Sequence, residues 1–186
     1  MTNSESIREY YADKWGEPAR VAEFRKSGLV VGLQKWKIER PAQPVPFLYA
    51  TAGASDYELP NMDPLHRQEF IATFSAECDG VARTLAWLGV QAHLTGRGFS
   101  PGDTYRDGNG VIEGLGFGGF LVITPRGELP TSVLLANGNH VEFLLAIPAF
   151  DDELAFASTQ GMDELMGVME NHRAPLSDPK RRSVFG

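Results

Sequence analysis

Apolar residues recur at helical spacing in two parts of the chain. Near the amino terminus the pattern predicts a helix over residues 4–15, because apolar side chains recur at Ile7, Tyr10, Tyr11 and Trp15. Ser6 and Glu9 have the spacing of a capping box, and Gly16 and Pro18 are expected to end the helix. A second helix over residues 81–96 is predicted by Val81, Leu85, Leu88 and Ala92. Its apolar stripe is expected to pack on a sheet.

Strand-like patterns surround these helices. Gln34, Trp36 and Ile38 alternate with Lys35 and Lys37, which predicts a half-buried edge strand ended by Pro41, Pro44 and Pro46. Residues 47–53 and 68–74 are rich in aromatic and β-branched side chains, and the turn residues at 61–64 lie between them. We therefore expect two antiparallel strands there.

Beyond a polar, glycine-rich segment at residues 98–119, the strand pattern returns at 120–124, 132–136 and 141–147, with Asn137-Gly138 as a hairpin turn. Asp151 can cap a short helix ending near Gly161, and a further helix follows it. Residues 177–186 fit either a tail or a final edge strand. The order predicts a single α+β domain over residues 1–186, with a mixed, mostly antiparallel sheet packed against helices.

Composition and charge narrow the function. The chain of 186 residues is 42% hydrophobic, carries a formal charge of -7, and has one cysteine, Cys78. Excess negative charge opposes a phosphate backbone, so nucleic acid is an unexpected ligand, whereas it would speed encounter with a basic protein. The amino terminus has no apolar signal core, no apolar run is long enough to cross a membrane, and no disulfide can form within the chain. A cytoplasmic location follows as an expectation.

Motifs of catalysis lack the context that their chemistry needs. Gly114, Gly116 and Gly119 match G-x-G-x-x-G, but a strand rather than a helix follows, and loop flexibility explains these glycines better. Ser55 lacks the second glycine of a nucleophile elbow. Acidic neighbours of Cys78 oppose a thiolate, which favours a structural role. The sequence thus predicts no catalytic residue, no metal and no cofactor.

One enzymatic alternative stays open. His66 and Glu69 form H-x-x-E, and folding could bring further histidines to them, which would make a small metal-dependent hydrolase. The plainer interpretation is that the histidines are isolated structural or surface residues and that Glu69 is an exposed charge on a strand.

Several segments, in order, resemble the Suppressor of Fused family, both the amino-terminal domain of its eukaryotic members and its single-domain bacterial relatives. These are FLYATAGASDYE at 47–58, RQEFIATF at 67–74, GFSPGDTY at 98–105, HVEFLLAIPAFDDELAFASTQGMDELMGVM at 140–169 and SDPKRRSVF at 177–185. The resemblance covers residues 47–185. It implies a mixed α/β sandwich, no catalytic residue set and no required cofactor.

The resemblance also implies a function. Eukaryotic members hold transcription factors between two domains by strand addition, and that complete cleft is not expected in a chain of this length. A single-domain bacterial member is expected to be an immunity protein that neutralises a cognate polymorphic toxin. A regulatory domain that binds an extended peptide is the other possibility.

Residues for partner binding are expected in the 98–119 segment and on neighbouring strand edges. Asp103, Tyr105, Arg106 and Asp107 combine charge with an aromatic anchor, as interfaces do. The alternative is a solvated loop with Tyr105 packed against the fold. Asp178, Arg181 and Arg182 match the closing segment of the family, or simply anchor the terminus by ion pairing.

Overall fold

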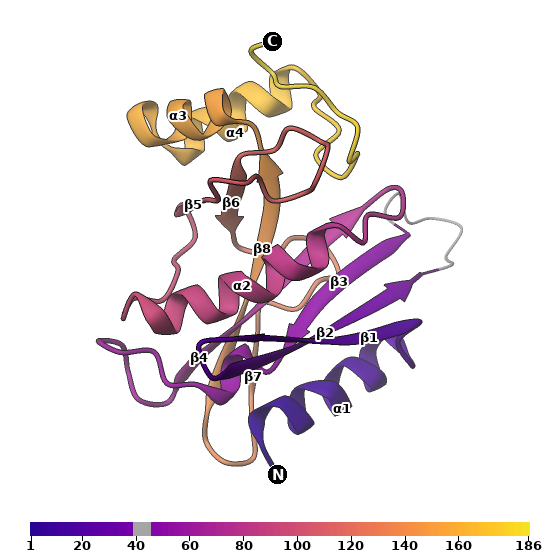
Figure 1. Ribbon diagram of the computed structural model, residues 1–186, viewed down its shortest axis with the longest axis vertical. Helices are drawn as coiled ribbons and strands as arrows, with labels where there is room; N and C mark the ends of the chain where they lie inside the picture. Colours follow the sequence, from indigo (N-terminus) through magenta and orange to yellow (C-terminus); the bar gives the residue numbers. More distant parts are fainter. Residues whose placement is uncertain (39–45) are drawn as a thin grey trace.

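A computed structural model describes residues 1–38 and 46–186, which form one twisted sheet with helices on both faces (Figure 1). The strand order is β1-β2-β3-β4-β8-β6-β5, and β7 also pairs with β8. Their bounds are β1 Arg20–Lys26, β2 Leu29–Lys37, β3 Phe47–Ala52, β4 His66–Phe74, β5 Thr104–Arg106, β6 Gly119–Ile123, β7 Ser132–Leu134 and β8 His140–Ala149. Among the described strands only β4 and β8 pair in parallel, so the predicted mixed, mostly antiparallel α+β fold is confirmed.

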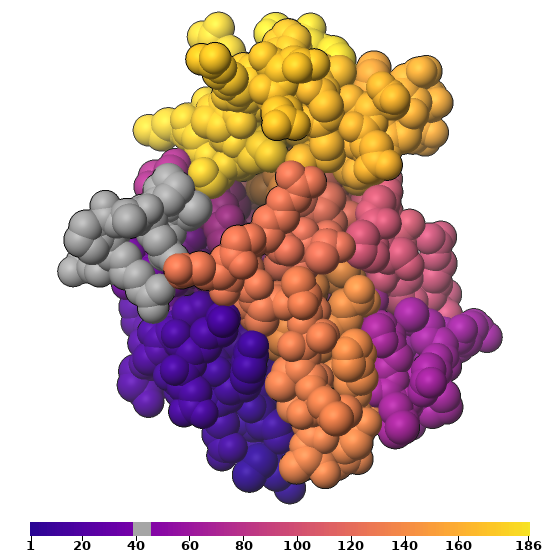
Figure 2. All heavy atoms as spheres, turned by 180° about the vertical axis from the view of Figure 1, so that it is seen from behind, coloured from indigo at the N-terminus to yellow at the C-terminus, as the bar shows by residue number. Residues whose placement is uncertain are grey.

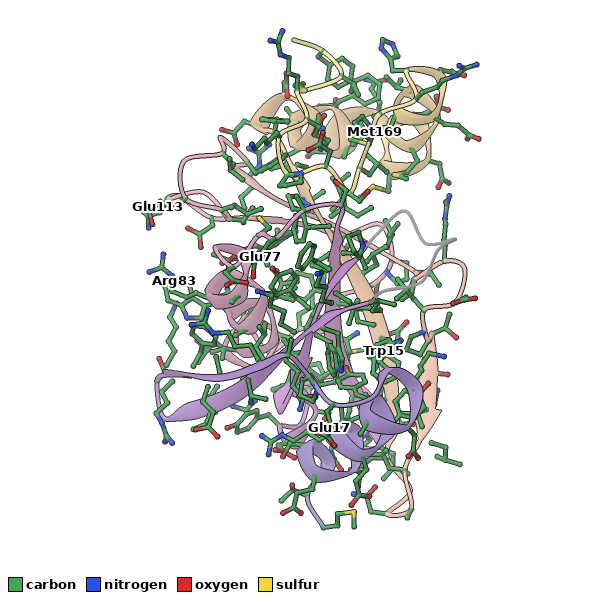
Figure 3. The ribbon with its side chains drawn as sticks, turned by 90° about the vertical axis from the view of Figure 1, so that its right-hand side faces the viewer. Trp15, Glu17, Glu77, Arg83, Glu113 and Met169 are labelled. Atoms are coloured by element: carbon green, nitrogen blue, oxygen red, sulfur yellow. The ribbon has the colours of Figure 1, made fainter. Side chains whose placement is uncertain are left out.

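Two apolar layers hold the helices to the sheet. Helix α2 (Val81–Leu94) covers one face, where Leu85 and Leu88 pack among Phe70 and Phe120. Helix α1 (Asn3–Trp15) lies on the other face, which also receives α3 (Asp151–Gln160) and α4 (Met162–Asn171) at one end of the molecule (Figure 1). Figure 3 shows Trp15 of α1 on the opposite side of the sheet from Arg83 of α2. With both faces covered, the sheet is accessible mainly at its edges.

The predicted helices are present, but two of their caps are different. At α1 the capping box is formed by Thr2 and Glu5: Thr2 Oγ1 accepts the Glu5 N–H at 3.2 Å and Glu5 Oε2 accepts the Thr2 N–H at 2.7 Å. The predicted Ser6 and Glu9 box is therefore wrong. At α3, Asp151 is already helical, and Glu153 accepts the N–H of Phe150 at 3.0 Å instead. In both cases the helix begins where a carboxylate can reach back to the preceding backbone.

The edge assignment for the strand at residues 34–38 is wrong. Strand β2 lies inside the sheet because β1, which the sequence did not reveal, pairs along its outer side. Gln34 and Trp36 are buried as a result. A second unpredicted strand, β5, lies within the 98–119 segment. Pro41 and Pro44, expected to end the strand, lie outside the described residues.

The carboxyl-terminal segment is an irregular arm rather than a strand. From residue 172 to 186 it contains neither a helix nor a strand, but it returns to the body of the protein. Arg181 donates from both terminal nitrogens to the two oxygens of Glu153, at 2.6 and 2.7 Å, and both side chains are buried. The predicted anchoring by ion pairing is thus confirmed for Arg181.

In the described ranges no helix is long and apolar enough to cross a membrane.

A polar node ties the start of α1 to two other elements. The Asn3 side chain donates to the carbonyl of Ser55 and accepts from the amides of Asn137 and Asn139, at 2.7 and 3.0 Å. The last two residues belong to the β7–β8 hairpin, which lies beside α1 in the view from behind (Figure 2). The predicted Asn137-Gly138 turn is confirmed, and it also serves to dock the helix.

Candidate protein-binding surface

Strand β5 is one free edge of the sheet, and the four predicted partner-binding residues lie on it or beside it. Within residues 1–38 and 46–186 it pairs only with β6, through Thr104↔Leu121 to Arg106↔Gly119. Asp103 precedes the strand and Asp107 follows it. The four residues therefore lie together at a strand edge, in a segment for which the sequence predicted a loop.

Tyr105 is fixed to the core through its ring. The ring centroid lies 6.4 Å from those of Phe99 and Phe120, and the hydroxyl donates to Asp107 Oδ2 at 3.3 Å. Burial, reinforced by the neighbouring Asp107 carboxylate, raises the pKa of the phenol to about 12. This half-buried side chain thus gives the edge strand rigidity as well as a contact surface.

The charged residues shape this edge and differ in their availability. Asp103 accepts the Ser100 N–H and the Arg97 guanidinium, both at 2.8 Å, and so fixes the turn that leads into β5. Asp107 accepts the N–H of Asn109 at 2.9 Å in the turn that follows. Arg106 is exposed and forms a 3.0 Å ion pair with the exposed Asp151. An ion pair in water is easily exchanged for another, so Arg106 is the most accessible group of the set.

A hollow of about 330 Å³ adjoins the β5 edge. It lies between the carboxyl-terminal end of α2 and the β5 segment, and its lining is Gln91, Thr95, Arg97, Gly98, Phe99, Asp103, Thr104 and Tyr105. Asp103 and Tyr105 of the predicted set contribute to it, whereas Arg106 and Asp107 do not. A hollow of mixed polarity beside the free edge of a strand suits a peptide side chain, because the strand edge supplies backbone groups and the hollow supplies selectivity.

His66 and Glu69 lie on opposite faces of β4, so they do not form together the metal site that the hydrolase alternative requires. His66 is on the α2 face, where Glu142 is 3.3 Å away and the ring centroid of His140 is 5.8 Å away. Glu69 points to the α1 face. Within residues 1–38 and 46–186, no three His, Cys, Asp or Glu residues are placed to hold a metal ion.

Glu69 is fully buried, so the expectation of an exposed charge is wrong. Its carboxylate accepts the Ser55 hydroxyl at 2.6 Å, the N–H groups of Gly53 and Ser55 at 2.9 and 3.0 Å, and the Thr51 hydroxyl at 2.5 Å. Burial raises its pKa, and these four hydrogen bonds oppose the rise without cancelling it. The group fastens the 3-10 turn η1 (Ala54–Asp56) to the sheet, and this use also occupies the Ser55 hydroxyl.

The glycine motif has a structural explanation. Gly114 and Gly116 have positive φ angles of 77° and 73°, which favour glycine in turns. Gly119 lies in β6 where a Cβ would collide with the Tyr105 carbonyl oxygen. The three glycines therefore serve backbone geometry, which is a more specific reason than the loop flexibility expected from the sequence.

The fold is that of an α+β domain of the Suppressor of fused type, as three solved structures show. A crystal structure of a putative Suppressor of fused homologue from Neisseria gonorrhoeae matches with a TM-score of 0.67 and 19% identity, over 98% of this chain and 96% of that one. The structure of a Sufu-Fu complex matches with a TM-score of 0.72 and 13% identity, over 99% and 93%. Drosophila Suppressor of Fused matches with a TM-score of 0.64 and 15% identity, and the present chain spans 50% of the length of that protein.

The sequence itself gives the family. The model of the Suppressor of fused protein (SUFU) family matches residues 30–182, so the chain belongs to that family. The predicted resemblance is thereby confirmed, and the match begins earlier than the predicted residue 47. Comparison with curated proteins gave no match.

Proposed function

We propose that this chain is a non-enzymatic, single-domain bacterial protein that acts in the cytoplasm by binding, and neutralises a cognate protein toxin. Membership of the Suppressor of fused family carries the proposal, because one solved relative is a Sufu-Fu complex, that is, a family member bound to another protein. The covered faces of the sheet support it as well, since they leave strand edges as the natural contact surfaces.

The proposed contact surface is the β5 edge with Asp103, Tyr105, Arg106 and Asp107. Its rigid aromatic anchor and its exposed arginine have the chemistry of residues that dominate binding energy at interfaces. The net charge of -7 suits a basic toxin, because opposite charge accelerates encounter.

Co-expression with the products of adjacent genes tests the function. We expect one neighbouring protein to be toxic alone, to co-purify with this chain, and to lose its toxicity in the presence of the chain. If every neighbour fails to bind, the immunity function is refuted. A stable complex with a non-toxic regulatory protein would instead favour the peptide-binding regulatory alternative.

Two substitutions test the surface. Arg106→Glu reverses an exposed charge, so we expect weaker binding of the partner by about tenfold or more with little change in stability. Tyr105→Phe keeps the ring packing that Tyr105→Ala would remove, and it isolates the contribution of the hydroxyl. Arg25→Glu, an equal charge change at the far edge of the sheet, is the control. Equal losses for Arg106→Glu and Arg25→Glu would remove the β5 edge from the interface.

A further inference from the structure

Strand β1 is the other free edge of the sheet, and its two faces differ. Arg20, Ala22, Phe24 and Lys26 alternate along it and face α2, because Ala22 and Phe24 line a pocket with Ala82 of that helix and Lys26 lies over Trp87. Val21, Glu23 and Arg25 point to the other side and are exposed. The α2-facing row is half-buried beyond Arg20, yet no strand covers the edge beside it in the described ranges.

A small pocket of about 170 Å³ lies under this edge. Its walls are largely apolar side chains from β1, β2 and α2: Ala22, Phe24, Leu33 and Ala82. The volume is of the order of one large apolar side chain. Ala22 leaves the space open where a larger residue of an edge strand would fill it.

The first end of the pocket is a closed network of charges around Asp79. Its carboxylate accepts from Lys35 at 2.7 Å, from the Tyr49 hydroxyl at 3.0 Å and from Arg20 at 3.1 Å, and Lys35 also pairs with Glu77. Lys35 is 7% exposed, so its charge is held in place by these partners. Arg20, in contrast, is largely exposed and can turn to a ligand.

Two further cations border the second end. Lys26 Nζ lies 3.9 Å from the centre of the Trp87 ring, and the guanidinium carbon of Arg83 lies 5.3 Å from it. Neither cation forms an ion pair with any residue in the described part of the chain. Figure 3 shows Arg83 and Glu77 on the same flank of the molecule. The groove as a whole carries four cations and two carboxylates, in a protein whose net charge is negative.

We propose that this β1–α2 groove, made of β1, the pocket and the cations Arg20, Lys26 and Arg83, binds an extended acidic segment of a protein partner. The segment adds to the sheet beside β1, places an apolar side chain in the pocket, and presents carboxylates to the cations at both ends. From Arg20 to Lys26 a strand covers about 20 Å, so seven residues span the groove, with alternate ones facing α2. This groove is distinct from the β5 edge, and its occupation does not depend on toxin neutralisation.

A labelled peptide tests the recognition pattern directly. The probe is Glu-Ser-Phe-Thr-Leu-Thr-Asp with blocked ends, measured by fluorescence polarisation against the whole chain at low salt. We expect it to bind at least about tenfold more tightly than Lys-Ser-Phe-Thr-Leu-Thr-Lys or Glu-Ser-Gly-Thr-Gly-Thr-Asp. A dissociation constant above about 1 mM, or equal affinity for the charge-reversed peptide, overturns the proposal. Tighter binding of a single-stranded oligonucleotide would overturn it in favour of a nucleic-acid site.

A matched pair of variants locates the site. Lys26→Glu and Arg25→Glu make the same charge change at adjacent positions of β1, but only Lys26 belongs to the groove. We expect Lys26→Glu to weaken peptide binding about tenfold and Arg25→Glu less than about threefold. Equal effects would mean that the peptide responds only to net charge and would refute the groove. Thermal unfolding of both variants verifies that each remains folded.

Discussion

Replacement of Arg181 by Met removes one half of a buried ion pair. Glu153 is 0% and Arg181 1% exposed, and the guanidinium also lies 5.1 and 5.4 Å from the rings of Phe150 and Phe117. The substitution leaves a carboxylate in the interior without its counter-charge. Loss of one partner from such a pair costs about 3–5 kcal/mol. Since domains are stable by about 5–15 kcal/mol, a large part of the stability should disappear.

Urea unfolding followed by tryptophan fluorescence measures this loss. In thermal unfolding of a chain of this size, a loss of about 3–5 kcal/mol corresponds to a fall in Tm of about 6–20 °C. Arg182→Ala is the control, because Arg182 is exposed and its loss should change stability by less than about 0.5 kcal/mol.

A second variant identifies the cause. Adding Glu153→Gln to Arg181→Met removes the isolated charge and keeps one acceptor oxygen, which can serve one of the two N–H groups, those of Phe150 and Val184, that bond to different oxygens of Glu153 at 3.0 and 3.1 Å. We therefore expect the double variant to be more stable than Arg181→Met alone. A loss below about 1 kcal/mol for Arg181→Met, or a double variant less stable than the single one, would refute the reasoning.

Three further predictions concern the interior. Gly119→Ala should lower the urea midpoint sharply, because the new Cβ collides with the backbone of Tyr105. The control Gly108→Ala places its Cβ in open space and should leave the midpoint unchanged, and equal midpoints for the two variants would contradict the prediction. Glu69→Gln should cost about 2–3 kcal/mol in the same assay, since its amide would turn a donor towards other donors, and an unchanged midpoint would argue against the network. Cys78 has its thiol pKa raised to about 11 by burial and by Asp79, so iodoacetamide at pH 8 should modify it far more slowly than the unfolded chain. Because the thiol pKa is higher in the folded than in the unfolded protein, the neutral thiol stabilises the fold below about pH 8.5, and this contribution to the free energy of unfolding disappears as the pH rises towards 11. Cys78→Ala should therefore reduce the loss of stability at alkaline pH.

Sequence patterns located the elements that bury repeated apolar residues. Helix α2 was found because its apolar stripe faces the sheet, and β3 and β4 because both of their faces are covered. Strand β1 was missed since its exposed face carries Val21, Glu23 and Arg25, and its inner face contains two cations. The parallel pairing of β4 with β8 joins residues 74 apart, and nothing local specifies such a partner.

Glu69 illustrates a signal that could have been used. It lies within the run Glu-Phe-Ile-Ala-Thr-Phe, which is too apolar for a strand with one wet face, so a carboxylate there must be buried and needs donors. The turn at residues 53–56 provides these donors through its N–H groups and the Ser55 hydroxyl.

The candidate surface could be predicted only in part. The sequence selected residues with suitable chemistry, but only the structure places Tyr105 on an edge strand and pairs Arg106 with Asp151.

The two free edges of the sheet have opposite chemistry. At β5 three carboxylates, Asp103, Asp107 and Asp151, outnumber two exposed arginines, Arg97 and Arg106, whereas the β1–α2 groove contains an excess of cations. The edges lie at the two ends of the strand order and share no residue, so changes at one should add to changes at the other. A chain carrying both Arg106→Glu and Lys26→Glu should therefore bind the acidic peptide as Lys26→Glu does and the protein partner as Arg106→Glu does. If Arg106→Glu alone weakened the acidic peptide as much as Lys26→Glu, the two surfaces would have to be treated as one.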